Sequence, residues 1–470
     1  MRRRWMSLTA ILIGMGSSAV MQTYLSVSMP SIVRELGGMP LYNWVFGAYM
    51  LASTVTIPLF GKMADLFGRR RLYMTGLILF TAGLLLCGLS AGMPMLIACR
   101  ALMGIGAGAV TPAAIGMTGE LFGEKDLPKV FGIMGLTQVL ANLLGPLMGG
   151  YISDAFSWRI GFMAFLPLEL VCALMISLGP SSNSTAERPK NKTSHWIGAE
   201  LKKLDWAGAL LLSAGLVGLV LGLQFIGWKQ TAAGVILAML ASLLLWLAFR
   251  WEKLHPEPVL PIPLLRQPEL RTGMISIFLL GILHNSSGTY LSLYYQNVLG
   301  KSATDAGVLL IPLLVSAGVA SAICGRVQRR VQNIVSQVLW LSAAFSFLGI
   351  ALLGSGFGGL TAMLFSIPIG LGIGFLLPLF LGDSQSHADD SNRAVSGGMV
   401  QLSRNLGGSI GVSLLGVWIS GTLPVPAGLT GIFLCLAAVG GLAFLFTLSS
   451  SRNAGLRQQN LKEGQDDILV

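Results

Sequence analysis

Apolar runs of about 20 residues, separated by short polar or charged segments, repeat along the whole chain. A helix needs about 20 apolar residues to cross the roughly 30 Å hydrocarbon core of a bilayer. The pattern therefore predicts an all-α polytopic membrane protein with fourteen transmembrane helices. The predicted spans are residues 8–33, 43–60, 72–90, 95–117, 130–152, 160–178, 206–225, 232–249, 272–298, 305–324, 334–353, 360–381, 395–420 and 429–448.

Composition supports this class and excludes others. Of the 470 residues, only 11% are charged and 53% are apolar, whereas a soluble protein has about 25% charged residues. The balance excludes a soluble enzyme, a disordered chain and a fibrous protein. The net charge of +11 comes from short clusters of lysine and arginine between the apolar runs. No basic stripe interleaved with aromatic residues is present, so nucleic acid is not an expected partner.

The distribution of positive charge predicts the orientation. With the N-terminus in the cytoplasm, 25 of the 31 lysines and arginines fall in cytoplasmic segments, as the positive-inside rule requires. We therefore expect both termini in the cytoplasm. The polar composition of the first large cytoplasmic loop predicts a flexible linker, and that of the residues after 451 predicts a disordered tail. The predicted units are an N-terminal six-helix bundle (1–180), a cytoplasmic linker (181–205), two inserted helices (206–250), a cytoplasmic loop (251–271), a C-terminal six-helix bundle (272–450) and a cytoplasmic tail (451–470).

Two sequence echoes indicate an internal repeat. Residues 61–71, between spans two and three, are echoed 264 positions later by residues 325–330, between spans ten and eleven. Residues 145–150 in span five are echoed by 407–411 in span thirteen. Both offsets fit two six-span halves around a two-span insert. Parallel halves of this kind are typical of transporters that bind substrate between the halves.

Several motifs carry a resemblance to a known family. Residues 61–71 resemble the first cytoplasmic-loop motif of the major facilitator superfamily, and 100–108 resemble its fourth-span motif, with Met103 where glutamine is usual. Residues 145–150 resemble the fifth-span antiporter motif. The fourteen spans, together with residues 158–159, 204–208 and 255–258, are similar to the drug:proton antiporter branch. One position departs from that branch, because Met21 stands where its first span usually carries an aspartate.

The resemblance implies a conformational latch in the first cytoplasmic loop, made by Gly61, Asp65, Gly68, Arg69 and Arg70. Asp65 would contact the start of span thirteen in the other half, where a helix N-terminus offers free N–H groups. The two arginines would hold Asp65 or phospholipid headgroups. The alternative is that the arginines only satisfy the positive-inside rule.

Span five carries a group of small residues and a proline. Pro146 removes a backbone hydrogen bond and bends the helix beside Gly145. Gly145 and Gly149 lie four residues apart and share a face, and Gly150 follows. By resemblance this face meets span ten of the opposite half and seals the interface against ion leak. Ordinary packing of small residues is the alternative.

Charged residues inside spans are the sharpest functional signal, because each costs about 2.5–3.5 kcal/mol or more to insert. Arg100 would bind an anion or tune a carboxylate, unless it only extends to the membrane interface. Glu169 is the only carboxylate deep within a span. We expect it to be a proton site balanced between burial and pairing with Arg100, or else a structural group. His284 is a candidate proton relay or a neutral buried histidine, and Arg404 is expected to line the cavity.

Neutral polar residues complete the predicted substrate and proton pathway. They lie on spans expected to line a central cavity, although amides also join helices structurally. These residues are Gln138, Asn142, Asn285 and Tyr290.

We predict a secondary active exporter of small amphipathic compounds, coupled to proton entry, that works by rocking of the two halves. The expected partners are a small-molecule substrate, protons and membrane lipids. We expect no cofactor, no metal and no enzymatic activity. We also expect the protein to be a monomer in the plasma membrane of a bacterium. An uptake or uncoupled facilitator is the alternative, because Met21 removes a usual coupling acid. A membrane-embedded enzyme or sensor is a remote third possibility, since the spans show no paired-aspartate, Ser/Lys or histidine-rich constellation.

Overall fold

The computed structural model describes residues 2–122, 127–179, 205–227, 230–255, 268–324, 327, 329–386, 393–420 and 424–466. Within these ranges every regular element is a helix and no strand is present, so the predicted all-α class is confirmed. Nearly all of the linker predicted at 181–205 and much of the loop predicted at 251–271 lie outside the described residues.

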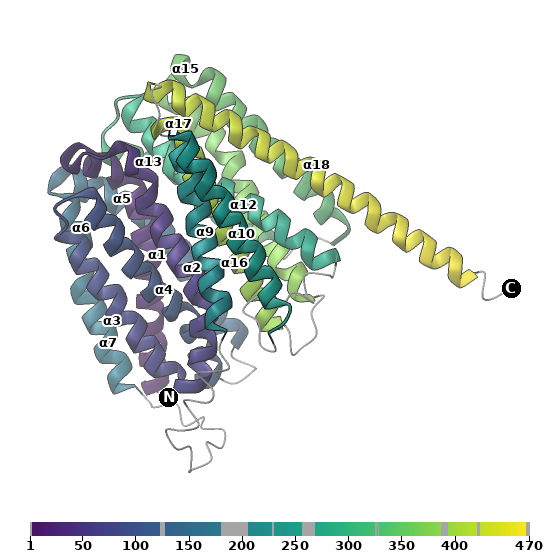
Figure 1. Ribbon diagram of the computed structural model, residues 1–470, viewed down its shortest axis with the longest axis horizontal. Helices are drawn as coiled ribbons and strands as arrows, with labels where there is room; N and C mark the ends of the chain where they lie inside the picture. Colours follow the sequence, from purple (N-terminus) through teal and green to yellow (C-terminus); the bar gives the residue numbers. More distant parts are fainter. Residues whose placement is uncertain are drawn as a thin grey trace, which may run out of the picture.

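The N-terminal half places its helices side by side (Figure 1). The first loop turns sharply at Gly68, whose φ of 94° is a backbone conformation that glycine adopts without strain. The elements are α1 (Arg2–Leu36), the 3₁₀ turn η1 (Met39–Leu41), α2 (Tyr42–Phe67), α3 (Arg69–Gly88), α4 (Met93–Leu121), α5 (Leu127–Ala155), α6 (Trp158–Ala164) and α7 (Leu166–Leu178).

The two inserted helices, α9 (Trp206–Gly227) and α10 (Thr231–Glu252), form a hairpin on the outside of the bundle (Figure 1). Close approach of the two helices is possible because Gly222 and Gly234 leave room for the facing backbone. The pair leans on α2 through a small apolar cluster that contains Trp44, Leu51 and Leu216. The insert therefore covers one side of the junction between the halves.

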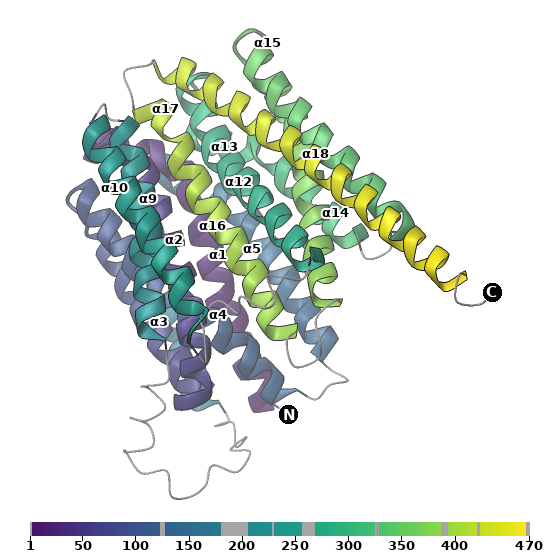
Figure 2. The same cartoon turned by 45° about the vertical axis from the view of Figure 1, so that its right-hand side comes forward.

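The C-terminal half begins after the insert and is rotated into view in Figure 2. Its elements are α12 (Pro268–Asn297), α13 (Ala303–Leu309), α14 (Ile311–Cys324), α15 (Arg329–Ser386), α16 (Arg393–Leu415), α17 (Val417–Ser420) and α18 (Val425–Asp466). The single helix α15 covers two predicted spans.

Equivalent helices of the two halves make equivalent contacts. In the first half α1 packs on α5 and α7, and α2 packs on α4; in the second half α12 packs on α16 and α18, and α14 packs on α15. Between the halves α2 meets α16, and α5 meets α13 and α14. This symmetry matches the repeat inferred from the sequence echoes.

Among the described residues, ten helical segments are long and apolar enough to cross a membrane. The remaining predicted spans correspond to α2, α9, α12 and α16, which are also helices. In α12 a polar run that begins at His284 lowers the apolar character of the helix. The chain is therefore a multi-pass helical membrane protein, and the total of fourteen spans stays a prediction.

The expectation of a disordered tail after residue 451 is wrong. Helix α18 continues without a break to Asp466 and projects beyond the bundle (Figure 1). The tail contains several good helix formers, including leucine, arginine, glutamine and lysine. A polar composition alone does not stop a helix that is already nucleated by a long apolar segment.

Candidate functional site

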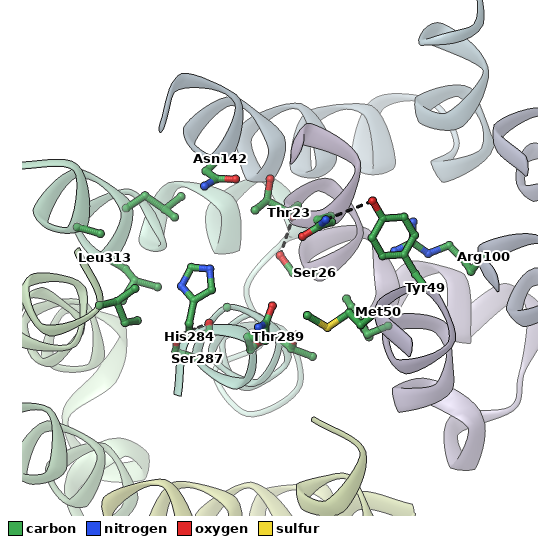
Figure 3. A pocket seen from close by; sticks show the side chains of 17 residues that line it. Thr23, Ser26, Tyr49, Met50, Arg100, Asn142, His284, Ser287, Thr289 and Leu313 are labelled. Carbon is green, nitrogen blue, oxygen red and sulfur yellow. Dashed lines mark hydrogen bonds between the residues drawn. The ribbon is translucent and has the colours of Figure 1, made fainter. Parts of the chain in front are cut away.

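A cavity of about 100 Å³ lies between the two halves. Helices α1, α2, α4 and α5 of the first half and α12, α14 and α15 of the second contribute to its wall (Figure 3). Its described lining residues combine polar and apolar side chains, and none of them is a carboxylate. The lining residues are Gln22, Thr23, Ser26, Phe46, Tyr49, Met50, Arg100, Asn142, His284, Asn285, Ser287, Gly288, Thr289, Leu313, Leu314, Ala317 and Ile373.

Arg100 and Tyr49 form one side of this cavity. The Arg100 side chain is 1% exposed, and its guanidinium carbon lies 4.2 Å from the centre of the Tyr49 ring. Its Nε donates to the carbonyl oxygen of Val45 at 3.2 Å. No described carboxylate forms an ion pair with it. The glycine face of α4 that follows Arg100 is covered by the α2 backbone, since Gly104 abuts the Tyr49 carbonyl.

The Tyr49 hydroxyl connects this side to α1. It shares a hydrogen bond of 2.8 Å with Ser18 and accepts another of 3.3 Å from Nε2 of Gln22. Figure 3 places the Tyr49 ring between Arg100 and the opposite wall. Tyr49 therefore acts as a cover that α1 holds over the buried arginine.

The opposite wall comes from α12, as the sequence predicted for His284 and Asn285. The His284 ring points into the space between the halves (Figure 3). Asn285 and Thr289 are joined along the helix by a bond of 2.9 Å from Thr289 Oγ1 to the Asn285 carbonyl oxygen. Asn142 of α5 also lines the cavity. Arg100, Asn142, His284 and Asn285 are thus brought together at one site.

Other predicted pathway residues lie elsewhere. Gln138 is exposed on α5 and is not part of the cavity wall. Arg404 is half-buried on α16 and interacts electrostatically with His284 without lining the cavity. The Tyr290 hydroxyl is buried, 2.9 Å from Oδ1 of Asn43 and 2.5 Å from the carbonyl oxygen of Val412.

Glu169 is separated from Arg100, so the expected competition between burial and pairing with that arginine does not arise. Glu169 lies on α7, 1% exposed, and its Oε1 accepts a hydrogen bond from Ser17 of α1. Its Oε2 is buried without a hydrogen-bond partner among the described residues. Leu170 and Leu174 of the same helix are exposed. Glu169 therefore turns inward from a peripheral helix, toward α1 rather than toward the cavity.

The predicted latch is described only in part. The surroundings of Gly61, the side chain of Asp65 and the side chains at the start of α16 lie outside what the structure describes. Arg69 donates to the Gly116 carbonyl oxygen at 2.9 Å and forms an ion pair of 3.4 Å with Glu120 of α4. Arg70 donates to the carbonyl oxygen of Ser177 of α7 at 2.6 Å. Both arginines thus have partners within the first half, and the latch through Asp65 stays a prediction.

The small residues of α5 divide their contacts between the halves. The expectation that Gly145 and Gly149 face span ten is wrong, because a Cβ on either glycine would meet the α1 backbone at Val20 or Tyr24. A Cβ on Gly150 would instead lie 2.6 Å from the Ala303 carbonyl oxygen, at the start of α13. The Pro146 carbonyl abuts Gly307 of the same helix. Pro146 and Gly150 therefore make the predicted contact with span ten.

Hydrogen bonds between the halves gather at the end of the bundle where α1 finishes at Leu36, which we call the far end. Asp154 at the end of α5 accepts from the Thr304 backbone N–H at 2.7 Å, the Thr304 hydroxyl at 2.6 Å and the Ala303 backbone N–H at 3.3 Å. Gln296 of α12 donates to the Val27 carbonyl oxygen of α1 at 2.8 Å. The hydrogen bond from the Tyr290 hydroxyl to Oδ1 of Asn43 joins α12 to the first turn of α2. Together these contacts close the far end of the junction.

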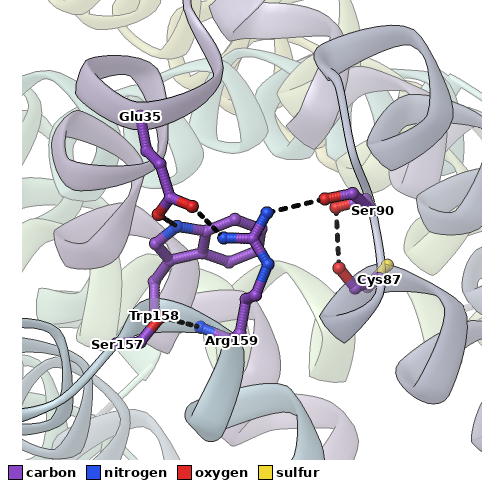
Figure 4. Close-up of polar contacts among 6 residues, drawn as sticks. All are labelled: Glu35, Cys87, Ser90, Ser157, Trp158 and Arg159. Carbon is purple, nitrogen blue, oxygen red and sulfur yellow. Dashed lines mark hydrogen bonds and ion pairs between the residues drawn. The ribbon is translucent and has the colours of Figure 1, made fainter.

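Residues 158–159 stabilise the first half. Glu35 accepts from Nε1 of Trp158 at 2.6 Å and forms an ion pair with Arg159 (Figure 4). Arg159 also donates to the Ser90 carbonyl oxygen at 2.8 Å and stacks over the Trp158 ring. This cluster joins the far ends of α1, α3 and α6 within one half. It explains the Trp-Arg motif as a structural clamp outside the cavity.

Sequence reasoning missed Tyr49, Ser18, Thr23, Ser26 and Thr289. A tyrosine or hydroxyl residue within an apolar run is usually a packing residue, and many hydroxyls bond their own helix carbonyls. The available signal was the presence of several polar residues within the apolar runs that form α1 and α2. Only the packing of α1 against α2 and α4 could identify which of them meet.

The two symmetric halves and the cavity between them are the architecture expected of a two-half transporter, and the comparisons give the same family. The sequence profile of the Major Facilitator Superfamily matches residues 7–412. The chain belongs to the Major Facilitator Superfamily. It is 31% identical over 420 residues to the Multidrug transporter protein MdtP of Bacillus subtilis, covering 88% of this chain and 75% of that protein.

Other superfamily relatives have similar names. The Multidrug resistance protein 3 of Bacillus subtilis is 28% identical and covers 86% of this chain and 78% of its own length. The Efflux pump FUS6 of Gibberella moniliformis is 28% identical and covers 88% and 73%. The chain thus lies among superfamily transporters named for drug resistance and efflux.

Solved structures share the superfamily fold. An auto-inhibited POT family peptide transporter superposes with a TM-score of 0.71 at 15% identity, covering 96% of this chain and 97% of that one. A bacterial homologue of the human lysosomal transporter Spinster, in an inward-facing and unoccupied conformation, gives a TM-score of 0.67 at 14% identity, with the same coverage of both chains. At these identities the likeness concerns the fold alone.

Proposed function

We propose that this superfamily transporter exports small amphipathic compounds across a plasma membrane, that of a bacterium, in exchange for protons. The observation that carries the proposal is the cavity between the two halves, lined by both apolar and hydrogen-bonding side chains. Such a mixed lining suits ligands with an apolar body and a few polar groups. The names of the relatives in Bacillus subtilis support efflux of drug-like compounds.

The proposed mechanism is alternating access around this cavity. The far-end contacts close one entrance, and α2–α16 and α5–α13 form the two symmetric seams along which the halves rock. A cavity of about 100 Å³ is smaller than the roughly 300–1,000 Å³ of sites for drug-sized ligands. The halves must therefore separate further when substrate enters.

Proton coupling is the finer part of the proposal. His284 in the cavity wall carries an imidazole that can accept and release a proton, and Glu169 is a buried carboxyl within the first half. Met21 is buried where the branch usually has an acid, which favours an uncoupled facilitator as the second candidate. Both candidates share the cavity and differ in the source of energy.

The test is flux in proteoliposomes that contain the purified full-length chain. Ethidium, a neutral drug and the acidic probe dansylglycine serve as test substrates, with and without an imposed pH gradient. Coupled export predicts accumulation against the substrate gradient only when the pH gradient is present. Flux that runs only downhill and ignores the pH gradient would establish the facilitator instead.

A further inference from the structure

Among the described residues that line the cavity, Arg100 is the one with a fixed charge, and that charge is positive. None of the described lining residues is a carboxylate, and Met21 leaves α1 without an acid beside Gln22. Of the described ionisable side chains at the wall, Tyr49 and His284 line the cavity beside Arg100, and His284 interacts electrostatically with the cationic Arg404. A ligand in this cavity therefore meets an electropositive environment.

The arginine that supplies this charge has incomplete partners. A guanidinium has five N–H donors, and Arg100 directs Nε to a carbonyl oxygen at 3.2 Å and Nη1 to the Met103 sulfur at 3.9 Å. The Tyr49 ring contributes a cation–π contact, which stabilises the charge without neutralising it. A buried charge is costly unless an opposite charge compensates it. The protein supplies no such counter-ion among its described residues.

We propose that the transported substrates carry a carboxylate on an apolar body, and that this carboxylate pairs with Arg100. The planar guanidinium matches a carboxylate with two parallel hydrogen bonds. The apolar body would lie along Phe46, Met50 and Leu313 in the same cavity. This inference rests on the proposed function, because it assumes that the cavity is the transport site.

Tyr49 controls access to the arginine in this scheme. Ser18 and Gln22 hold its hydroxyl from α1, so the ring must move aside before a carboxylate reaches the guanidinium. Gln22, which lines the cavity, is then released to donate a hydrogen bond within it. Binding of the acid is thus coupled to a change in the contact between α1 and α2.

The first experiment measures the charge preference of the wild-type protein. Binding of dansylglycine, its neutral amide and a dansyl-ethyl-trimethylammonium salt is followed by fluorescence polarisation in detergent. We expect the carboxylate to bind about tenfold more tightly than the amide, the range of a charge-assisted pair, and the ammonium to bind most weakly. Equal or tighter binding of the ammonium overturns the inference.

The second experiment changes the arginine. Arg100→Gln should weaken dansylglycine binding about tenfold and leave the amide within about twofold, which also reports that the site is folded. Arg250→Gln is the matched control, because Arg250 also stacks over an aromatic ring, Trp246, but on the exposed insert. If Arg100→Gln does not fold, Arg100→Lys replaces it and should lose part of the carboxylate preference. Unchanged carboxylate binding in a folded Arg100 variant overturns the inference.

Failure of this inference differs from failure of the proposed function. Transport of the ammonium probe, with the carboxylate neither bound nor moved, overturns the carboxylate site and leaves export intact. Arg100-dependent binding of the carboxylate, with no probe transported in proteoliposomes, supports the site and overturns the proposed transport.

Discussion

Glu169 is a buried side chain on a helix whose other residues are mostly exposed. Most of α7 faces outward with exposed leucines, yet Glu169 turns onto α1 and bonds Ser17. Its second oxygen has no hydrogen-bond partner among the described residues. A carboxyl in this position can gain or lose a proton without contact with the substrate, so a coupling role would act through α1.

Replacement of Glu169 by glutamine tests that role. Glutamine keeps the shape and the acceptor for Ser17 but cannot exchange a proton. We expect Glu169→Gln to abolish flux driven by a pH gradient while sparing substrate exchange at equal pH, both measured in proteoliposomes. Ser17→Ala, which keeps the acid, is the control and should retain driven flux. Normal driven flux in Glu169→Gln would move the proton site elsewhere, with His284 next in line.

The sequence could identify the buried charges but not their partners. Arg100 and Glu169 were recognisable because charges inside apolar runs are rare. Their separation was not, since helical spacing shows which residues share a face and not which helix covers that face. Tyr49 covers Arg100 because α2 packs on α4 at Gly104, a tertiary contact that no local pattern specifies.

At the scale of elements, α5 divides its small residues between two neighbours. Gly145 and Gly149 admit α1, whereas Gly150 admits the start of α13 from the other half. Two sets of contacts thus place α5 between α1 and the start of α13, which also contact each other directly. Hydropathy could predict the span and its bend, but not this division.

Substitution of Gly150 tests the contact with α13. A valine there would collide with the backbone of Ala303 and Thr304, so we expect α13 to be displaced and the thermal stability and transport rate to fall. Gly135→Ala on the same helix is the control, because its Cβ would meet open space. The control should be neutral or stabilising by about 0.5–1 kcal/mol. Thermal unfolding and flux, measured on both variants, decide; equal behaviour would contradict the assigned contact.

At the scale of the molecule, the sequence repeat corresponds to two symmetric interfaces between the halves. The pairing of α2 with α16 and of α5 with α13 relates the two halves, and the motif offsets of 264 and about 262 residues pointed to it. Which end of the seams is closed could not be predicted, because both states of a transporter share one sequence. The described hydrogen bonds between the halves answer this for the present state by gathering at the far end.

Asp154 makes the most extensive of these contacts, and its removal should shift the balance between the two states. It accepts three hydrogen bonds from the start of α13, but it is exposed, so we assign the set about 1 kcal/mol, a roughly fivefold change in the ratio of states. Asp154→Ala should therefore populate a conformation with the far end open.

Spin labels at Ala91→Cys and Lys301→Cys, on exposed loops of the two halves, report this as a longer distance population. The native cysteines are buried or half-buried and compete little for the label. Asp305→Asn, an exposed acid in the first turn of α13, is the control and should leave the distances unchanged; an unchanged distribution in Asp154→Ala would mean that apolar packing at Gly150 and Gly307 closes the far end by itself.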